Sequence, residues 1–192
     1  MKNKKRIVLV VFLLIFTGSL QMIVAQENRG PAAVIINHYA TRSFLEGTVP
    51  AADLDQIIQA GIRAPSASNR QPWYFTIIQN QDLAKKIVSN NVDGNVLIVV
   101  SAEGDGKTNT REIIDCSLAV ESIYLAAQAL GYGSRIYTGP INALNNNLKK
   151  ELNLPPGHNA IALVRVGRTA AVDAVSAASN RKKVEETVRY IK

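Results

Sequence analysis

The pattern of hydrophobic residues along this chain predicts both helices and strands. From Leu54, apolar residues recur at 57, 58 and 62, which is the spacing of a helix with one buried face. Residues 95–101 (NVLIVVS) form a nearly continuous apolar run, typical of a central strand covered on both faces. Residues 112–130 are apolar on nearly every side, so we expect a long helix enclosed by its own domain and by a second subunit.

Turn residues between these runs delimit the other predicted elements. Pro50 stands near the first position of the helix that contains Leu54, and Gly131 ends the long helix. Asn142 is a suitable N-cap for a more polar helix that carries Leu144, Leu148 and Leu152 on one face. Further helices are predicted at 32–39 and 83–88, and further strands at 73–78, 160–166 and, as a last strand, 188–191. The expected class is α+β, with helices around one small sheet in a single domain.

The first 25 residues have the three parts of a secretory signal peptide. A basic stretch at 2–6 precedes an apolar run at 7–16, and Ala25 provides a small-residue cleavage site before the folded domain at 26–192. An uncleaved membrane anchor over residues 7–25 is the alternative, which Gln21 weakens. Both interpretations send the body of the protein out of the cytoplasm, so we expect an exported protein, periplasmic or extracellular.

Charge and the rarer residue types exclude several classes of function. The net charge of +7 falls to +3 without the leader, because 18 basic and 15 acidic residues then remain. This ordinary charge, with no basic helix interleaved with aromatics, indicates no nucleic-acid partner. The single cysteine, Cys116, excludes an intrachain disulfide, and its apolar surroundings predict a small buried side chain rather than a reactive thiol. His38, in the helix at 32–39, and His158, in a turn at 155–158, are too isolated for a zinc site, and no Gly-x-Ser-x-Gly elbow indicates a hydrolase.

The segment with the most specific composition is residues 64–73, APSASNRQPW. Pro65 and Pro72 stiffen a loop between a helix and a strand. Ala67 allows a flat ligand to approach closely, and hydrogen-bonding groups surround it on Ser66, Ser68, Asn69 and Gln71. On the residues alone, a polar connector whose side chains satisfy local backbone groups remains the alternative.

This loop resembles the signature of the nitroreductase family of FMN-dependent oxidoreductases, and four other segments resemble that family in the same order. Residues 41–44 (TRSF) resemble the Arg-Arg-Ser motif before the second helix. Residues 115–133 resemble the long helix that forms the dimer, 160–168 the strand that follows, and 181–190 the C-terminal segment. The resemblance covers nearly all of residues 26–192. It implies a nitroreductase-like fold, a central and mostly antiparallel sheet surrounded by helices.

The resemblance also implies where an FMN cofactor binds. Arg42 and Ser43, with Arg181 and Lys183 from the C-terminal segment, would hold its phosphate, although surface charge is an equal alternative for Lys183. The partner subunit of a homodimer would line the isoalloxazine ring with loop residues Pro65, Ser66, Asn69 and Gln71. Thr138 and Gly139 lie where relatives point backbone N–H groups at the flavin, but a simple chain reversal is the alternative there. No catalytic side chain is expected, because the flavin supplies the hydride chemistry.

The chain departs from the family pattern at two positions. Thr41 replaces the first arginine of the motif, which predicts that one phosphate contact is lost. Leu45 stands where many relatives carry a basic residue that faces the pyrimidine edge of the flavin. Without that cation the reduced anion is less stable, so we expect a lower flavin potential.

Two functions follow from the resemblance. The first is an FMN-dependent oxidoreductase that passes two electrons to a nitroaromatic, a quinone or a similar small acceptor. Relatives take electrons from NAD(P)H, but no Gly-x-Gly-x-x-Gly marks a nicotinamide site here, and an exported enzyme would need another reductant. The second is a non-catalytic or degenerate flavin-binding protein, an FMN carrier or sensor, which Thr41 and Leu45 favour.

Overall fold

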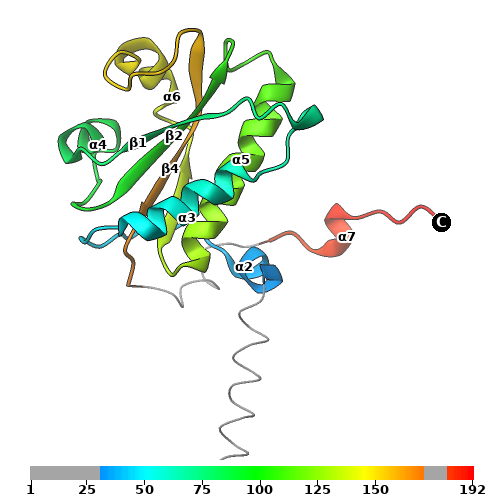
Figure 1. Ribbon diagram of the computed structural model, residues 1–192. Coiled ribbons are helices and arrows are strands. Elements are labelled where there is room, and N and C mark those ends of the chain that lie inside the picture. Colours follow the sequence, from blue (N-terminus) through cyan, green and yellow to red (C-terminus); the bar gives the residue numbers. More distant parts are fainter. Residues whose placement is uncertain (1–30, 171–180) are drawn as a thin grey trace, which may run out of the picture. The chain divides into compact units, whose positions relative to one another are not determined.

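The computed structural model describes residues 31–170 and 181–192, so the predicted signal peptide at 1–25 lies outside the described residues. The chain divides into two units, residues 1–37 and 38–192. The first contributes one described helix, α2 (Pro31–Asn37), which ends short of the predicted boundary at 39. The second holds the sheet and the other helices (Figure 1). Within the described ranges, no helix is long and apolar enough to cross a membrane.

Antiparallel strands form a single sheet, which confirms the predicted class. The described strands, in the spatial order β1-β2-β4-β3, are β1 (Tyr74–Ile78), β2 (Val96–Glu103), β4 (His158–Gly167) and β3 (Gly133–Tyr137). The predictions for β1, β2 and β4 agree with the structure to within two residues at each end. β3 was not predicted, because its five residues follow a glycine stop directly and only Ile136 and Tyr137 carry a strand-like apolar signal.

Helices cover both faces of this sheet (Figure 1). α3 (Ala51–Ile62) and α5 (Thr110–Ala129) pack on the face that includes Val96 and Ile98 of β2. On the other face, with Leu97 and Val99, lie α4 (Gln81–Ile87) and the short helix α6 (Ile141–Ala143), which continues into a π-helical turn, η2 (Leu144–Leu148). Successive residues of a strand point to opposite faces, so β2 is buried on both sides, as its unbroken apolar run predicts.

The two helices on the first face cross closely, and a glycine makes this possible. A Cβ atom built on Gly61 of α3 would lie 2.7 Å from the side chain of Ile123 in α5, closer than real contacts allow. Ile57 and Ile123 are both fully buried beside this crossing. At the other end of α3, the Tyr132 hydroxyl donates to Asp53 Oδ2 at 2.5 Å, which ties the first turn of the helix to the start of β3.

Two predicted features are wrong. The short helix begins at Ile141, directly after Pro140, so Asn142 lies inside its first turn and does not cap it. Pro140 has no N–H of its own to satisfy, and the Ile141 N–H is bonded by the Thr138 carbonyl at 3.2 Å instead of by a side-chain cap. Residues 188–191 form no strand, because no strand of the described sheet pairs with them; a short helix, α7 (Val184–Thr187), precedes them instead. Leu144, Leu148 and Leu152 are all buried, as predicted.

A side chain takes the place of a strand beside β4. The pairing of β2 with β4 shifts register between Val100 and Ser101, and β3 pairs with β4 only as far as Leu163. Beyond that point, the Ala160 backbone is bonded by the Asn145 amide. Asn145 Nδ2 donates to the Ala160 carbonyl at 3.0 Å, and the Ala160 N–H donates to Asn145 Oδ1 at 2.7 Å. One amide thus satisfies both polar groups of a residue that is only 1% exposed.

We predict that Asn145→Ala destabilises the fold. The substitution leaves one buried N–H and one buried carbonyl of Ala160 without partners, which lowers the free energy of unfolding by about 2 kcal/mol. Urea unfolding followed by far-UV circular dichroism measures this change. Asn146→Ala is the matched control, since Asn146 is an exposed neighbour in the same π-helical turn. Equal stability of the two variants would contradict the role assigned to Asn145.

Candidate functional site

The segment that carries Arg42 and Ser43 crosses one end of the sheet. The Thr41 N–H donates to the Ser134 carbonyl at 3.0 Å, at the start of β3. The Leu45 N–H donates to the carbonyl of Arg168 at 2.8 Å, just after β4. Arg42 and Ser43 lie between these two attachments, and both are exposed. The backbone is therefore held on either side while a guanidinium and a hydroxyl remain open to a ligand.

Thr41 supports this segment from inside the protein. Its side chain is 1% exposed, and its Oγ1 accepts the Ser134 N–H at 3.1 Å. A Cβ atom on Gly133 would lie 2.7 Å from Thr41 Cγ2, so the two residues are in close contact. A long basic side chain has no room in this orientation. Thr41 therefore contributes to the geometry of the segment, and the loss of one phosphate contact remains a prediction.

The predicted ligand loop lies at the opposite end of the sheet, before β1, and is anchored to α5. The Ala67 N–H donates to Asp115 Oδ1 at 3.0 Å, and Arg70 Nη2 lies 3.5 Å from Glu112 Oε1. Asp115 is 2% exposed, and neither its Oδ2 nor Glu112 Oε2 has a hydrogen-bond partner among the described residues. The first turns of α5 thus fix where this loop stands.

The loop is strained and largely exposed. Ser68, Asn69 and Gln71 have φ values of 54°, 53° and 48°, in the left-handed region that non-glycine residues seldom adopt. The Gln71 N–H donates to Ser66 Oγ at 3.0 Å, and Gln71 Nε2 donates to Asn69 Oδ1 at 3.2 Å. These local bonds agree with the polar-connector alternative. The strain favours a functional site, because unfavourable backbone conformations gather where a ligand is bound.

Within one chain, the two predicted parts of the site are far apart. α5 contacts Ala67 through Asp115, and it contacts Tyr39 through Gln128, whose Nε2 donates to the Tyr39 carbonyl at 2.9 Å. A helix rises 1.5 Å per residue, so these two anchor points are about 20 Å apart along α5. The two predicted parts of the site are therefore anchored near opposite ends of α5.

The remaining predicted residues lie on exposed backbone. Thr138 and Gly139 follow β3, and the Ile141 N–H donates to the Thr138 carbonyl at 3.2 Å, which is the chain reversal that the alternative interpretation expects. A Cβ atom on Gly139 would meet nothing within 4 Å, so this backbone is also open to a ligand. Arg181 and Lys183 are exposed, and no described hydrogen bond or ion pair joins them to Arg42 or Ser43.

The cysteine is a buried side chain, as predicted, and both histidines differ from their predicted positions. Cys116 is fully buried, and burial, with the nearby charges of Asp115 and Glu112, raises the pKa of its thiol to about 12. It therefore stays protonated and unreactive near neutral pH. His38 follows α2 rather than lying within a helix, and its ring meets the edge of Tyr124. His158 is the first residue of β4, so the turn ends one residue earlier than predicted.

Three residues of this region were not identified from the sequence. Asp115 is a carboxylate inside an apolar helix, Arg165 is a cation inside an apolar strand, and Asn95 begins the most hydrophobic run of the chain. All three are 2% exposed or less. A charged or amide side chain at a position that periodicity assigns to the core is the signal that could have found them.

We predict that the Asp115 carboxylate holds the ligand loop in place. Asp115→Ala removes the acceptor of the Ala67 N–H, so the Ala67 amide should exchange at least about tenfold faster in hydrogen-exchange experiments. Asp115→Asn keeps an acceptor oxygen and should preserve most of the protection. Ser117→Ala serves as the control, because Ser117 bonds only the Ile113 carbonyl one turn back. Unchanged Ala67 protection in Asp115→Ala contradicts the assignment.

The chain is similar in sequence to known proteins. A model of the Nitroreductase family matches residues 35–93 and 92–168. A protein of Archaeoglobus fulgidus is 29% identical over 144 residues, which are 70% of this chain and 82% of that protein. A protein of Methanothermobacter thermautotrophicus is 27% identical over 138 residues, 67% of this chain and 72% of that protein. Both carry the provisional name NADH dehydrogenase/NAD(P)H nitroreductase.

Solved structures share the fold. A nitroreductase of Bacteroides fragilis with bound FMN has a TM-score of 0.67 and 22% identity, over 84% of this chain and 98% of that one. A nitroreductase of Desulfitobacterium hafniense, also with bound FMN, has a TM-score of 0.70 and 21% identity, with the same two coverages. The family model, for its part, spans most of the described residues and includes both anchored segments. The chain therefore belongs to the Nitroreductase family.

Proposed function

We propose that this protein is an FMN-dependent oxidoreductase that transfers two electrons to a nitroaromatic, a quinone or a similar small acceptor. The match of the family model to residues 35–93 and 92–168 is the observation that carries this proposal. Two relatives of the same fold contain bound FMN, and two curated relatives are named for NAD(P)H-dependent reduction. The described residues are compatible with a flavin, since both predicted segments expose polar groups on a fixed backbone.

Different residues of this chain bind different parts of FMN. Arg42 and Ser43 bind the phosphate, because a guanidinium fork and a hydroxyl are suited to its oxygens and both side chains are exposed. Arg181 and Lys183 add positive charge from the C-terminal segment. The open backbone at Thr138 and Gly139 donates N–H groups to the ring. Bound FMN supplies the hydride chemistry, and the protein supplies position and electrostatics.

A homodimer completes this site. The loop with Pro65, Ser66, Asn69 and Gln71 is anchored through Ala67 about 20 Å along α5 from the anchor at Tyr39, so we infer that the loop of a second chain lies beside the flavin. α5 also exposes large apolar side chains, with Ile114 at 54% and Leu118 at 40%. Two copies of α5 packed antiparallel about a twofold axis cover these side chains and bring the two parts of the site together. The flavin then lies at the subunit interface.

Location constrains the electron donor. With the basic and apolar leader at 1–25, we propose that the protein is exported to the periplasm or beyond the cell. Nicotinamide cofactors are cytoplasmic, so an exported enzyme takes electrons from another reductant. NAD(P)H serves only if the leader holds the domain at the inner face, the reverse of the orientation that its basic residues predict. The acceptor is set by local loops rather than by the fold.

A second candidate function is an FMN carrier or sensor without catalysis. Leu45 favours it, because this side chain is 47% exposed beside the Arg42–Ser43 segment and is apolar where relatives place a cation. A protein of this kind holds FMN without being reduced by a nicotinamide.

One experiment separates the two candidates. The purified protein is examined by visible absorption and then mixed with NADPH, and separately with dithionite, without oxygen. A yellow protein that NADPH bleaches and a quinone re-oxidises supports the enzyme. Bleaching by dithionite alone, with no turnover of any acceptor, supports the carrier. A colourless protein that also fails to bind added FMN contradicts both.

We predict that Leu45→Lys raises the midpoint potential of bound FMN by about 20–30 mV. An ammonium group near the pyrimidine edge stabilises the reduced anion by roughly 1 kcal/mol at an exposed position, and 30 mV corresponds to about 1.4 kcal/mol for a two-electron couple. Redox titration of the holoprotein measures the shift. Thr48→Lys, which adds the same charge at another exposed position of this segment, should leave the potential nearly unchanged. Equal shifts in both variants would mean that Leu45 does not face the flavin.

A further inference from the structure

A buried arginine on β4 lies directly under the segment that carries Arg42 and Ser43. Arg165 is 2% exposed, and none of the ion pairs of the described residues includes it. Burial lowers the pKa of its guanidinium, which nevertheless stays charged near neutral pH. A buried cation without a carboxylate is costly, so its remaining contacts indicate why it is there.

The first of these contacts is with the segment that carries Arg42 and Ser43. The Arg165 guanidinium lies over the ring of Phe44, with Cζ 4.0 Å from the ring centroid. Phe44 is the residue after Ser43. A cation stacked on an aromatic face away from water is attracted to it strongly, and the planar fork of arginine fixes the plane of the ring. The position of Phe44, and with it the backbone of Ser43, therefore depends on Arg165.

The other side of the guanidinium is held by two asparagines. Arg165 Nε donates to Asn95 Oδ1 at 2.8 Å, and Nη1 donates to the Asn90 carbonyl at 3.1 Å. Asn95 is fully buried, and its Nδ2 donates to the Leu45 carbonyl at 3.1 Å. Asn95 thus bonds both the arginine and the segment that the arginine supports. Leu45 and Phe44 are fixed by two connected contacts rather than by one.

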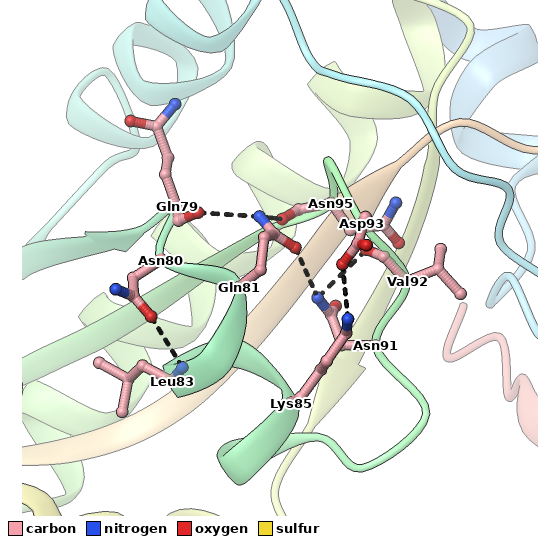
Figure 2. A network of polar contacts seen from close by, with 9 residues as sticks. All are labelled: Gln79, Asn80, Gln81, Leu83, Lys85, Asn91, Val92, Asp93 and Asn95. Carbon is pink, nitrogen blue, oxygen red and sulfur yellow. Dashed lines mark hydrogen bonds and ion pairs between the residues drawn. The ribbon is translucent and has the colours of Figure 1, made fainter.

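Figure 2 shows that residues 91–95 of the turn that leads to Asn95 contact side chains of α4. Gln81 Nε2 donates to the Asn95 carbonyl at 3.3 Å, and Asn91 Nδ2 donates to Gln81 Oε1 at 3.4 Å. Lys85 pairs with Asp93 at 2.6 Å. The Asp93 carbonyl in turn accepts the Gly47 N–H at 3.0 Å. The turn at 90–95 therefore contacts both Arg165 and the segment at 44–47.

We propose that Arg165 is a positioning residue of the flavin-phosphate site: by stacking on Phe44 and bonding Asn95, it holds Arg42 and Ser43 where they bind a phosphorylated flavin. This inference rests on the proposed function. Arg165 does not touch the ligand itself, since it lies beneath Phe44 in the fold. Its effect falls mainly on the residues that bind the phosphate, because it contacts Phe44 directly and reaches Leu45, at the ring edge, only through Asn95.

The test compares FMN with riboflavin, which has the same ring and lacks the phosphate. The full chain is stripped of flavin, and dissociation constants for both ligands are measured by fluorescence quenching. In Arg165→Met the dissociation constant for FMN should rise about tenfold, while that for riboflavin stays within about twofold of the wild type. Arg165→Lys keeps the charge but loses the planar fork, so its affinity for FMN should lie between those of the wild type and of Arg165→Met.

A matched control and a second variant keep the test decisive. Lys86→Met removes an exposed cation of α4 that pairs with Glu151 at 2.8 Å, and should leave both affinities unchanged. If Arg165→Met does not fold, Phe44→Leu removes the stacked ring from the other side and should show the same selective loss. Parallel loss of FMN and riboflavin, or no loss of either, overturns the positioning role. A wild-type protein that binds neither flavin overturns the proposed function as well.

Discussion

The packing of α5 across the sheet is the constraint on which the rest of the site depends. This helix fills one face of the core with Cys116, Ile123 and their neighbours, so it cannot shift without opening the interior. Its first turns hold the Ala67 backbone, and its last turn holds the Tyr39 carbonyl. α5 therefore fixes the relative positions of two segments that are distant in sequence. The proposed homodimer, with one segment from each chain at a flavin, rests on this arrangement.

Burial explains why polar groups hold these segments in place. Asp115, Asn95 and Arg165 lie where water cannot compete, so each hydrogen bond that they make is stronger and each missing one is more costly. Such groups do little for the overall stability of a fold, since their desolvation offsets much of the gain. These groups matter because their hydrogen bonds and stacking contacts are directional. A ring stacked on a guanidinium, or an N–H aimed at a carboxylate, has one preferred geometry where an apolar contact accepts many.

The sequence predicted the parts of the fold that depend on local pattern. The run at 95–101 predicted a strand covered on both faces, and the apolar stretch that ends near Leu130 predicted the longest helix. β3 was not predicted, because an edge strand of five residues is defined by its partner, β4, and not by its own composition. The expected strand at 188–191 failed for the converse reason, since an apolar run without a neighbouring strand has nothing to pair with. The left-handed conformation of Asn69 could not be predicted, because the anchors that impose it come from a helix more than 40 residues away.

The amide of Asn145 also has a consequence for how the protein behaves in concentrated solution. The stretch of β4 beyond the end of β3 is buried against η2, and a local opening of that turn would present a free N–H and a free carbonyl, the template to which an extended segment of another chain adds itself. Natural sheets avoid such association by blocking their open edges with charges, prolines or covering loops. Here one side chain occupies the vacant hydrogen-bonding groups, and no extra strand is needed. While η2 stays in place, one residue of this π-helical turn keeps that stretch of β4 from pairing with another chain.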